Sequence, residues 1–159
     1  MSVTVEPWAQ ALGRIPSGLF IVTVRAEAGE TGMLASWVQQ CSFTPPRVTV
    51  AVKKGRYLLD WLKPGTALTV NVLGEGQKSL IGHFGKGFEP GEPAFEGLAV
   101  RRSTHGAAVL EEALASIETT VVMQTEVGDH VLVVAEVVNG TVHHDGRPTV
   151  HVRKNGLTY

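Results

Sequence analysis

The sequence predicts a mainly β fold, a β-barrel with short helices. Valine and threonine are abundant, and 18 of the 159 residues are glycine, a composition typical of short strands joined by tight turns. Several runs alternate apolar and polar residues between glycine or proline punctuation, which is the period of a strand with one buried face. Strands outnumber helices without alternating regularly with them, which argues against a doubly wound α/β fold and favours a closed or split barrel.

The first element is a helix in "VEPWAQALGRIPSG", because Trp8, Leu12 and Ile15 fall on one helical face. The stretch from Pro16 to Gly18 ends it. The β-branched run "GLFIVTVRA" (18–26) predicts a strand, and the turn residues "EAGETG" lead into a second strand. The two form a predicted hairpin.

The middle of the chain continues with a strand in "MLASWVQQCSFTPP" that stops at Pro45-Pro46, since proline donates no N–H to a ladder. "RVTVAVKK" (47–54) alternates cleanly and predicts the next strand. A short helix in "GRYLLDWLK", a strand over 66–74 and a short helix in "EGQKSLIGHFGKGF" follow. The last of these runs into a glycine-rich loop, and "EPGEPAFEGLAVRRSTHG" predicts mostly irregular chain.

The last third predicts three or four strands with turns at "EVGDH" and "HHDGRP". "HVLVVAEVV" is apolar on both faces, which indicates a central strand of a sheet or barrel, or a subunit contact. The expected total is seven or eight strands and two or three short helices. No repeat or linker divides the chain, so we expect a single domain over residues 1–159.

Charge and composition exclude several classes of function. The net charge is −1, from 14 Lys and Arg against 15 Asp and Glu, so no strong field favours nucleic acid or an anionic membrane. Cys41 is the only cysteine, which excludes an internal disulfide. The apolar runs are far shorter than the ~20 residues of a membrane span, and the N-terminus lacks a signal-peptide pattern. We expect a cytoplasmic protein.

One candidate anion site lies in "AVKKGRYLLDW", where Lys53, Lys54 and Arg56 stand between a strand and the start of a helix. Free N–H groups at a helix start, together with basic side chains, favour a phosphate. A solvated basic turn is the alternative interpretation.

Two further stretches carry weaker signals. "SLIGHFGKGF" places His83 and Lys86 among glycines that allow close backbone approach to a ligand, although a helix C-terminus with a glycine stop gives the same pattern. "EVGDHV" pairs Asp129 with His130, which suits a general acid or a hydrogen-bonding anchor, and also an exposed polar turn.

The residues argue against a metal site and a reactive thiol. Of six histidines only His143 and His144 are adjacent, and neighbouring strand residues point to opposite faces. No HExxH or CxxC is present. "QQCSF" supplies neither a cation nor a helix start that would activate Cys41, so we interpret that cysteine as a small structural residue.

Taken in order, five blocks of the sequence resemble the flavin reductase-like family of FMN-binding split barrels, and most of all the flavin-reductase domain of cyanobacterial diflavin flavodiiron proteins. The blocks are "ALGRIPSGLFIVT", "GMLASWVQQCSFTPPRVTVAVKKGR", "NVLGEGQKSLIGHFGKGF", "ETTVVMQTEVGDHVLVVAEVVNG" and "VRKNGLTY". The resemblance implies a homodimer with one FMN per subunit, FAD being less expected, and NAD(P)H as the reductant. The diiron and flavodoxin domains of those proteins have no counterpart in this sequence, which leaves the electron acceptor open.

The resemblance also assigns residues. "MLASW" would meet the isoalloxazine, "CSF" would lie beside the flavin or its ribityl chain, and the basic turn and "HFGK" would lie near the phosphate. The "GDH" turn would place His130 at the reactive side of the flavin, as the catalytic residue. The cofactor-binding residues expected from the family are Leu34, Ala35, Ser36, Trp37, Cys41, Ser42, Lys53, Lys54, Arg56, His83, Phe84 and Lys86.

The function that this resemblance implies is an FMN-binding, NAD(P)H-dependent flavin reductase. The nicotinamide would give a hydride to the flavin, and the protein would supply binding and orientation. No GxGxxG fingerprint is present, so a dinucleotide would bind in an open cleft across the flavin. Two alternatives stay open: a non-enzymatic FMN-binding electron-transfer or storage protein, and an oxidase of the related pyridoxamine-phosphate oxidase-like branch.

Overall fold

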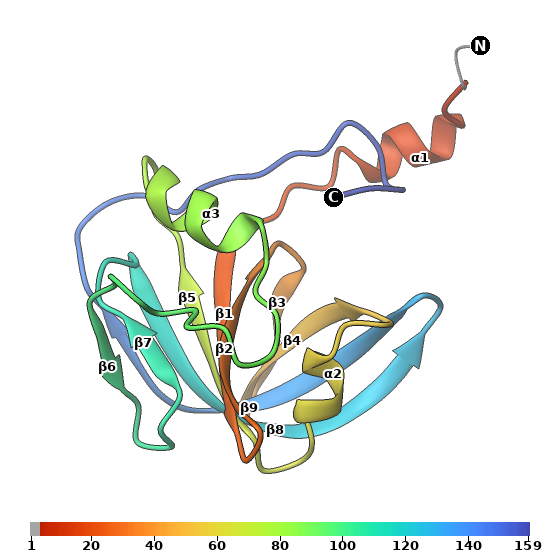
Figure 1. The fold of residues 1–159 in the computed structure, drawn as a ribbon. Coiled ribbons are helices and arrows are strands. Elements are labelled where there is room, and N and C mark those ends of the chain that lie inside the picture. Colours follow the sequence, from red (N-terminus) through yellow and green to blue (C-terminus); the bar gives the residue numbers. More distant parts are fainter. Residues whose placement is uncertain (1–3) are drawn as a thin grey trace.

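The computed structural model describes residues 4–159, which fold around one curled antiparallel sheet (Figure 1). Its seven strands are β1 (Phe20–Ala26), β2 (Gly29–Ala35), β3 (Val38–Phe43), β4 (Pro46–Lys53), β5 (Ala67–Val72), β8 (Ala115–Val127) and β9 (His130–Val142). A separate two-stranded ribbon pairs β6 (Val100–Arg102) with β7 (Ala108–Leu110). The helices are α1 (Pro7–Leu12), α2 (Leu58–Trp61) and α3 (Lys78–Gly85). The predicted mainly β fold is confirmed.

The order of the strands explains why the sheet curls. The order is β2-β1-β5-β8-β9-β4-β3, so β2 and β3 are the two edge strands. Only Ser36 and Trp37 separate them in the sequence. A two-residue link can join opposite edges only if the sheet bends until those edges meet. The result is a barrel that is split between β2 and β3, and we call this opening the seam.

Two hydrophobic cores hold the barrel. The predicted alternation on β4 is confirmed, because Val48, Val50 and Val52 all face the barrel interior. The second core lies outside the barrel, where Ile21 of β1 packs with Phe84 of α3. Strand β1 is therefore buried on both faces, which accounts for its continuous apolar run.

The last third contains three strands, β7, β8 and β9, within the predicted three or four. Strands β8 and β9 form one long hairpin of 13 residues each, with register shifts in the pairing at Glu118/Thr119 and at Val121/Met123. Strand β9 lies between β8 and β4, so its predicted central position is confirmed. Its burial alternates, however: Val131 and Val133 are buried, whereas Leu132 is only half-buried on the outer face. The rest of the chain therefore covers the outer face of β9 only in part.

Two other predictions were incomplete. Helix α1 exists, but its expected apolar face is largely exposed, with Trp8 at 55% and Ile15, beyond the helix end, at 61%. The helix projects from the sheet and buries only Ala9 (Figure 1). The stretch 89–106, predicted as mostly irregular, contains strand β6. This strand has only three residues, which is too short to show an alternating pattern in the sequence.

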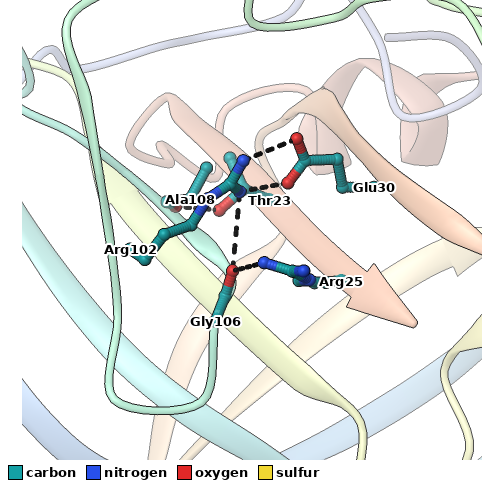
Figure 2. A network of polar contacts seen from close by, with 6 residues as sticks. All are labelled: Thr23, Arg25, Glu30, Arg102, Gly106 and Ala108. Carbon is teal, nitrogen blue, oxygen red and sulfur yellow. Dashed lines mark hydrogen bonds and ion pairs between the residues drawn. The ribbon is translucent and has the colours of Figure 1, made fainter. Parts of the chain in front are cut away.

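The β6–β7 ribbon is attached to the β1–β2 hairpin by polar contacts (Figure 2). Arg102 forms a two-point ion pair with Glu30, in which Nη2 lies 2.8 Å from Oε1. The Gly106 carbonyl accepts hydrogen bonds from Arg25 at 3.4 Å and Arg102 at 3.5 Å. The buried Thr23 hydroxyl donates to the Ala108 carbonyl. These contacts fix the ribbon over the outer face of β1.

Replacing Asn71 by leucine is expected to lower the free energy of unfolding by about 2–4 kcal/mol, because it deprives several buried groups of their hydrogen bonds. Asn71 is fully buried; its Nδ2 donates to the Ile21 carbonyl at 3.0 Å, and its Oδ1 accepts from Leu110 N and Ser116 Oγ at 2.9 Å. Urea denaturation measures the change, with the exposed Thr125→Ala as control. A stability equal to the wild type would show that the asparagine does not hold these elements together.

Candidate functional site

A cavity of about 300 Å³ lies at the seam of the barrel, a size at the lower end of small-molecule sites. Residues 33–37 supply one wall, and residues 51–53 of β4 supply another. Leu19 and Ile81 add apolar surface, and Arg56 adds a second cation beside Lys53. The cavity thus combines apolar walls with two positive charges.

The structure brings together six of the predicted cofactor-binding residues around this seam cavity. They are Leu34, Ala35, Ser36, Trp37, Lys53 and Arg56. They meet because the link between the two edge strands passes directly beside the end of β4. The Trp37 carbonyl accepts a hydrogen bond from Ala51 N at 3.0 Å, which ties the link to β4.

A larger hollow of about 750 Å³ adjoins the seam cavity, and the two share Met33, Leu34, Arg56 and Gly85. Two further predicted residues, Phe84 and Lys86, line this second hollow.

Phe84, Tyr57 and His83, which lie on or near the larger hollow, have different roles. Phe84 is 1% exposed and belongs mainly to the core under α3. The Tyr57 hydroxyl donates to the Phe88 carbonyl at 2.8 Å and holds the glycine-rich loop. The Nε2 atom of His83 lies 2.7 Å from the Ala94 carbonyl, and its ring lines a third hollow of about 390 Å³. His83 therefore does not reach the seam cavity.

Three other predicted residues are not brought to the cavity. Cys41 and Ser42 lie on the edge strand β3, where the pairing with β4 is irregular between Gln40 and Ser42, and the Cys41 side chain is exposed. Lys54 points to Glu126, with 3.6 Å between Nζ and Oε1. Strand β4 ends at Lys53, so Lys54 is the first residue of the following turn, and it does not line the cavity.

The basic turn also differs from the expectation of a helix-start phosphate site. Helix α2 has only four residues, with no side-chain cap at its start. Its end cannot supply much of a dipole. The preference for an anion at this turn depends instead on the side chains of Lys53 and Arg56.

The Asp129–His130 pair lies at the start of β9, next to the cavity but not on its wall. His130 Nδ1 is 2.7 Å from Asp129 Oδ1, and this hydrogen bond lowers the pKa of Asp129. Nδ1 carries the proton, because an ionised carboxylate only accepts. The His130 ring lies 4.8 Å from that of Trp37.

Sequence reasoning assigned no role to Tyr159 or Arg153, although both belong to the closing block quoted for the resemblance. Tyr159 lines the seam cavity, its hydroxyl contacts His130 Nε2, and burial raises its pKa. The Arg153 guanidinium lies 4.8 Å above the Trp37 ring. The sequence did offer one signal for these two residues: the closing block "VRKNGLTY" contains an aromatic residue and a cation and had been given no role of its own.

Comparison with known proteins decides the family. Residues 12–157 match the family model described as "Flavin reductase like domain". The chain belongs to the flavin reductase-like family. A curated relative, diflavin flavoprotein A 1 of Synechocystis sp. (strain PCC 6803), is 40% identical over 152 residues, which cover 94% of this chain and 26% of that protein. This flavin reductase-like chain therefore spans about a quarter of that relative.

Solved structures agree with the fold. The NADH:FAD oxidoreductase SgcE6 of Streptomyces globisporus C-1027 superposes with a TM-score of 0.83 at 25% identity, covering 97% of this chain and 94% of that one. A flavin reductase domain protein of Arthrobacter sp. FB24 superposes with a TM-score of 0.77 at 24% identity, covering 89% and 87%. The family and the split-barrel fold expected from the resemblance are confirmed.

Two absences concern the part of the chain that the structure describes. Within residues 4–159, no three His, Cys, Asp or Glu side chains gather where they could hold a metal ion. None of the helices in that range has the length and apolar character to cross a membrane.

Cys41 is expected to react with a thiol reagent at the same rate with and without saturating FMN, because its side chain is exposed and does not line the seam cavity. Labelling followed by absorbance measures the rate, and the single cysteine makes the signal unambiguous. Cys41→Ser is expected to keep flavin binding and activity. Protection of the thiol by FMN would place Cys41 beside the ligand and contradict this reading of the site.

Proposed function

We propose that this domain binds FMN in the seam cavity and catalyses its reduction by NADH or NADPH. The observation that carries the proposal is the convergence of residues 34–37, Lys53 and Arg56 on one cavity. Apolar walls suit a flat ring system, and the two cations suit a phosphate.

The residues present fit the parts of FMN. The small side chains of Ala35 and Ser36 let the backbone approach a flat ring closely. Leu34 and Trp37 offer apolar and aromatic surface to that ring. Lys53 and Arg56 bind the phosphate, and Arg56 is able to do so through two parallel hydrogen bonds.

The bound flavin supplies the hydride-accepting chemistry. The chain supplies the environment for it: Leu34 and Ile81 keep water from one side of the cavity, and Lys53 and Arg56 fix the ligand along it. The pair of Asp129 and His130 holds a proton at Nδ1 close to the cavity wall.

The nicotinamide nucleotide is proposed on two grounds. A similar solved protein is by name an NADH:FAD oxidoreductase. The larger hollow beside the seam cavity also leaves open space next to the flavin site. That space would equally admit the adenylate half of FAD, so FAD is the second flavin to test.

The proposal is tested with purified protein and oxidised FMN or FAD. We expect saturable binding of FMN, and bleaching of its visible absorbance when NADH or NADPH is added without oxygen. If the protein binds flavin but neither nucleotide reduces it, the result would support the alternative of a non-enzymatic electron-transfer or storage protein. A protein that takes up no flavin would contradict the proposal.

Lys53→Ala and Arg56→Ala are each expected to weaken FMN binding about tenfold, since each removes a charge-assisted hydrogen bond to phosphate. Riboflavin has no phosphate, so its affinity is expected to stay unchanged in both variants. Fluorescence titration with the two ligands measures the difference. Lys54→Ala is the matched control, because Lys54 pairs with Glu126 and does not line the cavity. An equal loss of FMN and riboflavin affinity would place the phosphate elsewhere.

We further propose that the domain is a homodimer, as the family resemblance implies. An apolar groove of about 760 Å³ runs between the start of the chain and the outer face of the sheet. Its walls include Leu12, Ile15, Val38 and Leu132. It thus joins the exposed face of α1 to the partly exposed outer face of β9. A second copy of the chain would cover both surfaces at once.

Ile15→Asp is expected to convert the dimer into a monomer, because a charge cannot be buried unpaired in an apolar contact. Size-exclusion chromatography with light scattering measures the mass. Ala28→Asp, in the exposed β1–β2 turn, is the control and should remain dimeric. A monomeric wild-type protein at micromolar concentration would refute the dimer.

A further inference from the structure

The segment that follows β9, residues 143–159, returns along the molecule to the seam. It forms no strand or helix, yet hydrogen bonds hold it at successive points. Thr149 N donates to the Leu73 carbonyl at 2.9 Å, and Ser17 and His151 exchange two backbone bonds. In Figure 1 this closing segment runs back beside the start of the chain toward α1.

The end of this closing segment interlocks with α1 through two glycines. Gly156 N donates to the Ala9 carbonyl at 2.6 Å. A Cβ atom added to Gly156 would lie 2.4 Å from Leu12 Cβ, and one added to Gly13 would lie 2.7 Å from Asn155 Cα. Neither distance is sterically possible without movement. The path of the segment is therefore built into the packing, and it sets where the next residues lie.

That path delivers the Tyr159 side chain to the wall of the seam cavity. Its ring centroid is 5.3 Å from Trp37 and 5.9 Å from His130, the latter at a near edge-on angle of 69°. Its hydroxyl contacts His130 Nε2, whose other nitrogen is bound to Asp129. His130 does not itself line the cavity. A ligand in the cavity therefore meets Tyr159, with the Asp129–His130 pair behind it.

We propose that Tyr159 contacts the ligand in the flavin site. Asp129 and His130 act on the ligand indirectly, by holding the Tyr159 hydroxyl in place. The inference rests on the proposed flavin function. The Tyr159 and Trp37 rings form the aromatic side of the cavity, where a flat aromatic ligand gains stacking or edge contacts. His130, with its proton on Nδ1, accepts the Tyr159 O–H at Nε2. The phenol oxygen keeps a free lone pair for a ligand N–H.

The orientation of Tyr159 is fixed by these contacts. Beyond Gly156, the closing segment's described polar contacts are the bond from Leu157 N to Asn155 Oδ1 and the one between Tyr159 and His130. The Arg153 guanidinium lies over the Trp37 ring, which Tyr159 also contacts. Tyr159 is thus held by the same side chains that form the site.

The test compares the affinity for oxidised FMN, without nicotinamide, across matched variants of the full chain. Tyr159→Ala is expected to weaken FMN binding roughly three- to tenfold, the usual size of an aromatic contact. Tyr159→Phe keeps the ring and should lose less than about threefold. Gly156→Ala shifts the segment off α1 and should weaken binding as Tyr159→Ala does. Leu157→Ala is the control in the same segment, because its side chain is exposed and lines no part of the cavity.

A second readout does not depend on flavin. The ¹⁵N signals of the His130 ring in the ligand-free protein should shift in Tyr159→Phe, because the hydrogen bond to Nε2 is lost, and should stay in place in Leu157→Ala. An unshifted His130 signal would overturn the positioning role.

The affinities separate this inference from the function on which it rests. Wild-type affinity for FMN in Tyr159→Ala would overturn the role of Tyr159 and leave flavin binding intact. Tighter binding in that variant would also overturn it, since Tyr159 would then be excluding the ligand. Absence of FMN binding by the wild-type protein would overturn both.

Discussion

The two-residue link between the edge strands is the constraint on which the rest of the structure depends. Strands β2 and β3 lie at opposite edges of the sheet, and Ser36 and Trp37 are all that joins them. The sheet has to close on itself for this link to exist, and it closes without pairing its two edges. A split barrel of this kind leaves backbone and small side chains facing an opening, which a fully paired barrel would have sealed.

The chemistry of the site follows from what lies beside that link. Strand β4 pairs with β3, so its end brings Lys53 next to the seam, and the following turn adds Arg56. Helix α3 covers the outer face of β1 and contributes Ile81 and Gly85 to the cavity. Residues 34–37, Lys53 and Arg56 come from one block of the sequence, which folds back through β3 and β4. The rest of the cavity wall, from Leu19, Ile81 and Tyr159, comes from elements that are distant in the sequence.

Local patterns in the sequence were sufficient for the strands with one buried face, since alternation identified β4. The family resemblance, and not a local pattern, pointed to "MLASW", which the structure places at the seam cavity. The length of the strands in the last third was not predictable, because irregularities let one long strand, β8, change register without a turn signal. The apolar face of α1 led to the wrong expectation that this helix packs on its own chain. An apolar stripe shows that a face is suited to burial, but not which chain covers it.

Cys41 and Tyr159 show why proximity in the sequence is a poor guide to the residues of the site. Cys41 lies four residues from Trp37, yet a strand that leaves the seam carries it to an exposed edge. Tyr159 lies more than a hundred residues away and reaches the same Trp37, because residues 143–159 retrace the molecule to α1. Proximity in sequence is informative only inside one element. Contacts made by an irregular segment depend on its anchors, here the close approach of Gly156 to Leu12.

The position of Trp37 links the seam cavity to the apolar groove. Ser36, Trp37 and Ala51 line both the seam cavity and the apolar groove. Arg153 stacks on Trp37 from within the groove, and its buried Nη1 has no hydrogen-bond partner among residues 4–159. A second copy seated in the groove would press on the back of the wall that a flavin touches. Under the proposed dimer, flavin binding and dimer formation share these residues, and any coupling between them acts equally in both directions.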